Sequence, residues 1–216
     1  LTRAGARRFL LTLVASGYAT REGRTFRLSS RLIAVARTWL SGSSLWSFAE
    51  PHMRKVSASL NESCSAAILA DEDVVYVARV ASRRILSVGL HVGTRLPAHC
   101  TSMGRVLLAG LPPAELAAFL AKSEIRALTS KTVTDRRALA ALIARAREDG
   151  HAVVDEELEM GLRSIAVPIR DRAGATVAAI NVSTQSARFT ARELEREALP
   201  HLREAAAAIE NFFVVQ

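Results

Sequence analysis

Apolar positions along the chain recur first with the period of a helix and then with the alternation of strands. Residues 2–16 place four apolar side chains on one helical stripe: Ala6, Phe9, Leu10 and Leu13. Thr2 can accept the first free backbone N–H groups of this helix, and Gly17 ends it. Residues 18–30 alternate around a Glu22-Gly23 turn, which predicts a short hairpin. Helix and hairpin form the second half of a winged helix-turn-helix, so we expect a missing N-terminal piece to cover the stripe.

A third helical period begins at Ser30. Its apolar positions are Leu32, Val35 and Trp39, and it runs to a polar break at residues 41–44. We therefore predict a linker helix over residues 30–44. A second domain then opens with a helix over residues 45–60, in which Pro51 fits the first turn or a kink.

The remaining pattern mixes strands with helices, which is typical of an α+β domain. The predicted elements are two strands within 62–80 around residues 71–73, a strand over 85–92, a helix after Pro97, helices over 112–120 and 135–148, strands over 151–159 and 164–184 with a turn at 173–174, and a helix over 190–212. The predicted organisation is thus a partial winged helix over residues 1–29, a linker helix over 30–44 and an α+β domain over 45–216.

Composition narrows the class of protein. The chain has 216 residues, half of them hydrophobic, which is enough to bury a sizeable core. Its apolar runs are too short for a membrane span, and its first residues lack the cleavage site of an export signal. Two cysteines, Cys64 and Cys100, form neither a disulfide framework nor a zinc-binding pattern. We therefore expect a soluble cytoplasmic protein.

The net charge of +8 is concentrated at the N-terminus. Residues 1–40 hold eight arginines and a single acidic residue, Glu22, whereas the rest of the chain is nearly neutral. In a winged helix the helix enters the major groove of DNA and the hairpin follows the phosphates. Operator double-stranded DNA is the expected partner, and the candidate contacts are Thr2, Arg3, Arg7, Arg8, Arg21 and Arg24.

The segment LPAHCTSMGRVLLAGLPP, residues 96–113, contains the start of a predicted helix. Pro97 excludes a helix through the preceding residue, and Thr101 or Ser102 can cap the helix that follows. Free N–H groups and the positive end of the helix dipole at such a start favour a carboxylate or a phosphate. Three interpretations remain open from these residues alone: an ordinary cap, an anion-binding site, or a nucleophile on a sharp turn.

The alternative function is a cytosolic hydrolase that uses Cys100 or Ser102. His99 adjoins the cysteine, but neighbours in an extended segment point to opposite faces, and the run lacks the G-x-S-x-G pattern. The five histidines show no metal-ligand spacing, so we predict no metal site and no cofactor.

Five stretches resemble the IclR family of bacterial transcriptional regulators, and within it the branch that controls aromatic-acid breakdown through protocatechuate and β-ketoadipate. They are residues 6–18, 74–79 (VVYVAR), 92–109, 150–169 and 178–183 (AAINVS). The resemblance implies a homodimer or homotetramer that represses or activates a catabolic operon and is not an enzyme. It also implies that the second domain is an effector-binding domain similar to the GAF and profilin-like fold.

The resemblance further implies a small carboxylic-acid effector, aromatic or dicarboxylic, whose acid group rests on the helix start at Ser102, Met103 and Gly104. Matching motif positions assign the remaining contacts to Val154, Leu162, Ser164, Asn181 and Ser183. The run of acidic residues at 155–157 and 159 adds Asp155, which either lies on a solvated loop rim or faces the pocket. Val154 stands where the family often has an acidic residue, so the contacts known for short keto acids do not carry over.

Overall fold

The computed structural model describes residues 2–32, 35, 44–82 and 90–215. The chain divides into two compact units, Leu1–Ser44 and Leu45–Gln216. Most of the predicted linker helix and of the predicted strand over 85–92 lies outside the described residues. The division into a DNA-binding part, a linker and an effector domain stays a prediction about function.

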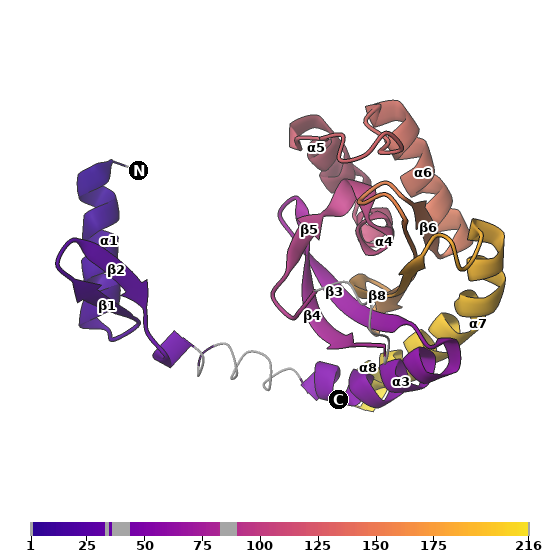
Figure 1. Cartoon of the computed structure of the whole chain (residues 1–216), viewed down its shortest axis with the longest axis horizontal. Coiled ribbons are helices and arrows are strands. Elements are labelled where there is room, and N and C mark those ends of the chain that lie inside the picture. The colour runs from indigo at the N-terminus through magenta and orange to yellow at the C-terminus, as the bar shows by residue number, and fades with distance from the viewer. Residues whose placement is uncertain (1, 33–34, 36–43, 83–89, 216) are drawn as a thin grey trace. The chain divides into compact units, whose positions relative to one another are not determined.

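The first unit contains a helix and a hairpin, as predicted. Helix α1 (Arg3–Ala15) starts at Thr2, whose hydroxyl accepts the N–H of Gly5 at 3.2 Å, and ends before Gly17 at a φ of +78°. Strands β1 (Ala19–Glu22) and β2 (Thr25–Leu28) pair antiparallel, as Figure 1 shows. The apolar stripe of α1 is partly uncovered: Phe9 and Leu13 are 64% and 38% exposed, whereas Ala6 and Leu10 are half-buried. The winged-helix assignment therefore stays a prediction.

The second unit is built on a six-stranded sheet in which all neighbours are antiparallel. Its order is β5 (Arg95–Pro97), β4 (Asp73–Val80), β3 (Ser63–Ala70), β8 (Thr176–Gln185), β7 (Leu162–Arg170) and β6 (Ala152–Asp155). The sheet curls around one helix, α4, in Figure 1. The α+β class is confirmed, although the predicted strand over 151–159 is shorter, because β6 ends at Asp155.

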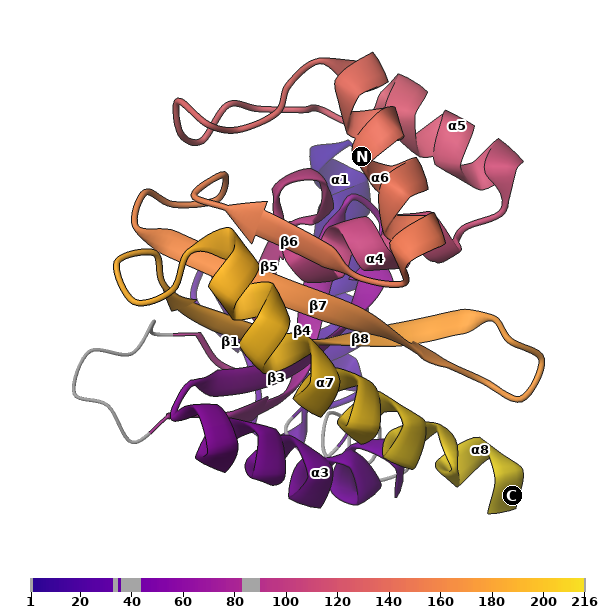
Figure 2. The same cartoon turned by 90° about the vertical axis from the view of Figure 1, so that its right-hand side faces the viewer.

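Helices cover both faces of the sheet. The outer face carries α3 (Ser44–Leu60) and α7 (Ala191–Glu210), which is followed by α8 (Phe212–Val215), as Figure 2 shows. The inner face carries η1 (Ala98–Cys100), α4 (Ser102–Gly110), α5 (Pro113–Lys122) and α6 (Arg136–Asp149). Pro51 lies inside α3, well beyond its first turn, so the first-turn alternative is wrong.

The two faces of the sheet differ in side-chain size. The outer face presents large aliphatic residues such as Ile165, Val167 and Ile180 to α3 and α7. The inner face presents small residues such as Ala166 and Ala179 to α4. Because small side chains let a helix approach closely, α4 packs against the middle of the sheet.

One irregularity interrupts the pairing of β3 with β4. Ala66 lies opposite Ala78, whereas the next residue, Ala67, lies opposite Tyr76. Val77 is therefore an extra residue in β4, which makes this a β-bulge. Side chains before and after the bulge no longer follow a strict alternation.

Candidate functional site

A cavity of about 430 Å³ lies between the inner face of the sheet and the start of α4. Six of the predicted effector-binding residues line it: Ser102, Val154, Leu162, Ser164, Asn181 and Ser183. They come from α4 and three strands, and their place in the sequence gives no sign of this proximity. The fold brings them together.

Strand register explains why polar side chains form the floor of this cavity. Val154 on β6 lies opposite Ser164 on β7, which lies opposite Ser183 on β8, which lies opposite Ser63 on β3. Residues directly opposite in antiparallel strands share a face, so these four side chains form one row across the sheet. All four line the cavity.

A second row carries a cation that the sequence analysis missed. Asn181 lies opposite Ser65, which lies opposite Arg79, and the Arg79 guanidinium donates to Ser65 Oγ at 3.0 Å and to Ser63 Oγ at 3.3 Å. Burial lowers the pKa of Arg79, but a guanidinium keeps its proton in proteins. The bulge at Val77 places Arg79 on the same face as Tyr76, and both line the cavity.

The start of α4 shows which backbone groups are already occupied. Thr101 is the N-cap, and its hydroxyl accepts the N–H of Gly104 at 3.2 Å. The Gly104 N–H is thus held by the cap, whereas the first two helical N–H groups, those of Ser102 and Met103, have no partner within the helix. Of the two caps that the sequence allows, the structure has Thr101.

Two buried polar atoms beside the cavity lack hydrogen-bond partners among the described residues. They are Ser102 Oγ and Asn181 Oδ1, on side chains that are 0% and 3% exposed. Asn181 Nδ2 donates to Ser183 Oγ at 3.0 Å, so only its oxygen is left over. Buried polar atoms are nearly always hydrogen-bonded in native proteins, so two exceptions at one cavity point to a bound molecule.

Three predicted effector-binding residues do not line the cavity. Met103 is 1% exposed and its side chain packs in the core between α4 and the sheet. Gly104 packs against η1, where an added Cβ would lie 2.1 Å from the Ala98 carbonyl oxygen. Asp155 pairs with Arg163 at 2.7 Å. Local packing and charge pairing therefore occupy these positions.

The acidic run after β6 is held by cations and amides instead of forming a bare rim. Hydrogen bonds from Lys131, Ser186 and the Gly161 N–H lower the pKa of Glu156 to about 2. The Glu157 carboxylate accepts from buried Arg105 at 2.6 Å. Of the whole run, only Glu159 lines the cavity. Asp155, the last residue of β6, is 37% exposed and does not line the cavity; its role in effector binding stays a prediction.

Sequence reasoning missed twelve further residues that line the cavity. They are Glu62, Ser63, Tyr76, Arg79, Ser82, Leu90, Cys100, Thr101, Leu158, Glu159, Thr184 and Gln185. Tyr76 and Arg79 belong to the VVYVAR stretch that carries the family resemblance, and Cys100 and Thr101 lie just before the predicted helix. Those two stretches were the available signals; the other residues come from strand ends and loops.

The cysteine and histidine of this segment are not arranged as a nucleophile and a base. Burial raises the pKa of Cys100 to about 12, and its thiol points toward the Pro97 carbonyl oxygen at 3.8 Å. His99 Nε2 lies 3.0 Å from the Arg126 carbonyl oxygen. Within the part of the chain that the structure describes, no three His, Cys, Asp or Glu side chains could together hold a metal ion.

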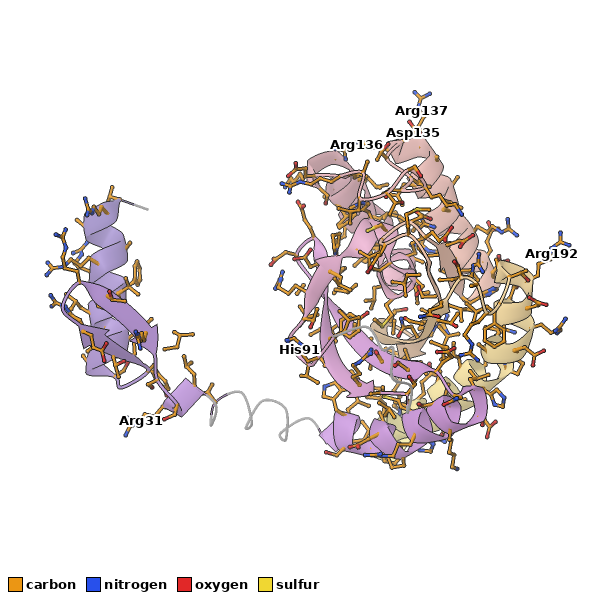
Figure 3. The ribbon with its side chains drawn as sticks, in the orientation of Figure 1. Arg31, His91, Asp135, Arg136, Arg137 and Arg192 are labelled. Carbon is orange, nitrogen blue, oxygen red and sulfur yellow. The ribbon has the colours of Figure 1, made fainter. Side chains whose placement is uncertain are left out.

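The candidate DNA contacts lie on the surface of the first unit. Arg3, Arg7 and Arg8 are exposed on α1, and Arg21 and Arg24 are exposed on the hairpin. The Thr2 hydroxyl caps α1. In the second unit the labelled Arg137 and Arg192 project to solvent from α6 and α7 in Figure 3.

Across the described ranges, no helix is long and apolar enough to cross a bilayer.

Comparison with known proteins places this geometry in a family. The family model described as bacterial transcriptional regulator IclR, C-terminal, matches residues 37–211. The chain is 45% identical to the Pca regulon regulatory protein of Pseudomonas putida over 94% of its own length and 70% of that protein.

Two solved structures are also similar. An IclR homologue from Microbacterium hydrocarbonoxydans in complex with 4-hydroxybenzoate is 30% identical, with a TM-score of 0.81 over 100% of this chain and 88% of that one. The inducer-binding domain of the Acinetobacter transcription factor PobR, a double mutant with 3-hydroxybenzoic acid, is 31% identical, with a TM-score of 0.72 over 79% and 99%. By sequence and by structure, the chain belongs to the IclR family of bacterial transcriptional regulators.

Proposed function

We propose that this protein is a ligand-responsive, DNA-binding regulator of an aromatic-acid catabolic operon, and that the cavity beneath α4 binds its effector. The observation that carries the proposal is the pair of buried, unpartnered atoms at the cavity, Ser102 Oγ and Asn181 Oδ1. Support comes from the similarity to a regulator of the Pca regulon and to a family member in complex with 4-hydroxybenzoate.

The cavity suits a small aromatic acid of the protocatechuate pathway. The acid group would accept from the Ser102 hydroxyl and the free N–H groups at the start of α4, where the helix dipole favours negative charge. The ring would lie against Val154 and Leu162, and a ring hydroxyl would donate to Asn181 Oδ1. Arg79, the one cation among the described lining residues, gives a second oxygen of the effector a charged donor.

For the first unit we propose DNA binding through α1 and the hairpin. The exposed Arg3 and Arg7 on α1 would reach bases, whereas Arg21 and Arg24 on the hairpin would contact phosphates. Arg21 is held in place by a hydrogen bond from its Nε to the Gly23 carbonyl oxygen at 2.8 Å. Binding to paired half-sites requires at least a homodimer, which we propose as the functional assembly in the cytoplasm.

We expect no catalytic activity from the cavity. The high pKa of Cys100 leaves the thiol protonated near neutral pH, and a thiol is a poor nucleophile compared with its thiolate. Ser102 Oγ has no base beside it among the described residues. A hydrolase needs both an activated nucleophile and a base oriented to serve it.

The experiment compares two buried serines, one that lines the cavity and one that does not. Ser102 Oγ and Ser123 Oγ are both buried without a partner, but only Ser102 lines this cavity. Neither Ser102→Ala nor Ser123→Ala should lower the stability of the ligand-free protein, because each removes an unsatisfied hydroxyl. Isothermal titration would use protocatechuate, 4-hydroxybenzoate, β-ketoadipate and glyoxylate.

We expect Ser102→Ala to weaken binding of the preferred acid about tenfold or more, since a hydrogen bond to a charged group contributes about 1.5–3 kcal/mol. Ser123→Ala should bind as the wild type does. The proposal is wrong if Ser102→Ala binds the same acid with unchanged affinity, if glyoxylate binds best, or if none of the acids binds to the wild-type protein.

A further inference from the structure

The loop of residues 156–161, which joins β6 to β7, forms one wall of the cavity. It contributes Leu158 and Glu159 to the lining. A second wall comes from residues 100–102 of η1 and α4. These two walls are far apart in sequence, so the space that an effector can occupy depends on how they are held relative to each other.

A buried ion pair joins the two walls. Arg105 lies one helical turn after Ser102, and its Nη2 donates to Glu157 Oε2 at 2.6 Å. The two side chains are 4% and 8% exposed. Glu157 directly precedes Leu158, so the pair connects the start of α4 to the loop at the residue next to the cavity.

The pair is incompletely satisfied on the arginine side. Arg105 Nε has no hydrogen-bond partner among the described residues, so Glu157 is the acceptor that holds the guanidinium. Glu157 Oε2 also accepts the N–H of Val133 at 3.2 Å, and its carbonyl oxygen accepts from the Thr132 hydroxyl at 2.6 Å. Removing either member of the pair leaves the other charge buried, which is strongly unfavourable.

The loop backbone is constrained as well. Glu156 has a φ of +58°, a left-handed conformation that is uncommon for a side chain other than glycine. Its carboxylate accepts from Lys131, from Ser186 and from the Gly161 N–H, which closes the loop on itself. The loop thus has a fixed internal shape, and the Arg105–Glu157 pair sets its position against α4.

We propose that Arg105 and Glu157 are positioning residues for effector binding, because they hold the helix start and the loop wall at the separation that the ligand requires. This inference rests on the proposed function of the cavity. Neither residue lines the cavity, so the pair acts through the placement of Ser102 and Leu158.

The test uses three variants of the ion pair and one control, Arg147, which lies on α6 and contacts the C-terminal end of α4. Arg105→Met and Glu157→Gln each break the ion pair, whereas Arg105→Lys keeps a cation near Glu157. In the control, Arg147→Met removes the Arg147 hydrogen bonds to the Ala109 and Leu111 carbonyl oxygens at 2.6 and 2.7 Å, at the C-terminal end of α4. Affinity for protocatechuate and 4-hydroxybenzoate is measured by isothermal titration, and amide hydrogen exchange of the ligand-free protein follows residues 101–104 and 156–161.

We expect Arg105→Met and Glu157→Gln to bind at least about tenfold more weakly, Arg105→Lys to recover most of the affinity, and Arg147→Met to bind as the wild type does. Amide exchange should rise in both walls together in the two broken-pair variants. Unchanged affinity in those variants, or an equal loss in Arg147→Met, would overturn the inference.

If the wild-type protein bound neither acid, the proposed function would be wrong, but amide hydrogen exchange of the ligand-free variants would still test the role of the ion pair. In that case, raised exchange in both segments supports the pair as the connection between the walls. Exchange that stays at the wild-type level in either segment overturns it.

Discussion

Gly104 offers a quantitative test of how closely α4 packs on η1. A Cβ built at this position would lie 2.1, 2.4 and 2.6 Å from the carbonyl oxygen, Cα and carbonyl carbon of Ala98. All three are backbone atoms, so no side-chain rotation relieves the overlap. Gly104→Ala can be accommodated only if the start of α4 moves away from η1.

Two effects oppose each other in this substitution. Alanine is the better helix former by about 1 kcal/mol, which on its own would stabilise α4. Overpacking a tight interior costs about 1–3 kcal/mol, and backbone overlap of this severity belongs at the upper end. We therefore expect a net loss of about 2 kcal/mol. A protein of this size loses about 2–4 °C of Tm per kcal/mol, so the second unit should unfold about 4–8 °C lower.

The assay is thermal and denaturant unfolding of the wild type and Gly104→Ala, monitored by circular dichroism. Ala144→Gly is the control, since Ala144 is exposed inside α6 and the substitution reports helix propensity alone, with an expected cost of about 1 kcal/mol. If Gly104→Ala were as stable as the wild type or more stable, the close approach of α4 to η1 would be refuted.

Two further predictions concern DNA and pH. Replacing Arg21 and Arg24 with alanine should lower the slope of log affinity against log salt concentration by about one for each lost phosphate contact, whereas Arg3→Ala or Arg7→Ala should relax the choice of DNA site. Fluorescence anisotropy with promoter duplexes over a salt series measures both effects, with Arg192→Ala as the control. An unchanged salt series in the hairpin variants would contradict the prediction. Burial raises the pKa of Cys64 and of Cys100 to about 12, so the unfolded chain loses these thiol protons at lower pH than the folded protein does. The free energy of unfolding should therefore fall as pH rises above about 8.5. Denaturant unfolding curves across this pH range measure it, and a free energy of unfolding that does not change with pH would contradict the prediction.

Local signals in the sequence predicted most helices well. Asp135 caps α6 through the N–H of Ala138 at 2.7 Å, and Thr190 forms a capping box with Glu193 at α7, so both helices begin where their polar residues indicate. The hairpin of β3 and β4 also turns at the predicted residues. These elements depend on interactions between residues that are close in sequence, which is why a pattern reveals them.

The site was harder to predict because its contacts are long-range. A glycine at a helix start suits both a bound anion and a close backbone contact. The sequence shows neither that Ala98 lies against Gly104 nor that the Thr101 hydroxyl holds the Gly104 N–H. Asp155 likewise resembles a pocket carboxylate until Arg163 is placed beside it. Of the six predicted residues that line the cavity, Ser102 was indicated by the local signals of a helix start. The other five lie on three separate strands and were found through family motifs, since those strands give no local sign of proximity.

The extra residue in β4 has a consequence for how this cavity can change. Because Val77 shifts the phase of the strand, Arg79 reaches the inner face from a position that simple alternation would assign to the outer one. If Val77 were lost, Tyr76 would still lie opposite Ala67 and Arg79 opposite Ser65, in a ladder without interruption. The guanidinium would therefore stay on the inner face, where it is the only charged donor among the described lining residues. A change of one residue in the length of β4 at this position can therefore leave the cation of the cavity in place, because the bulge takes up the extra residue.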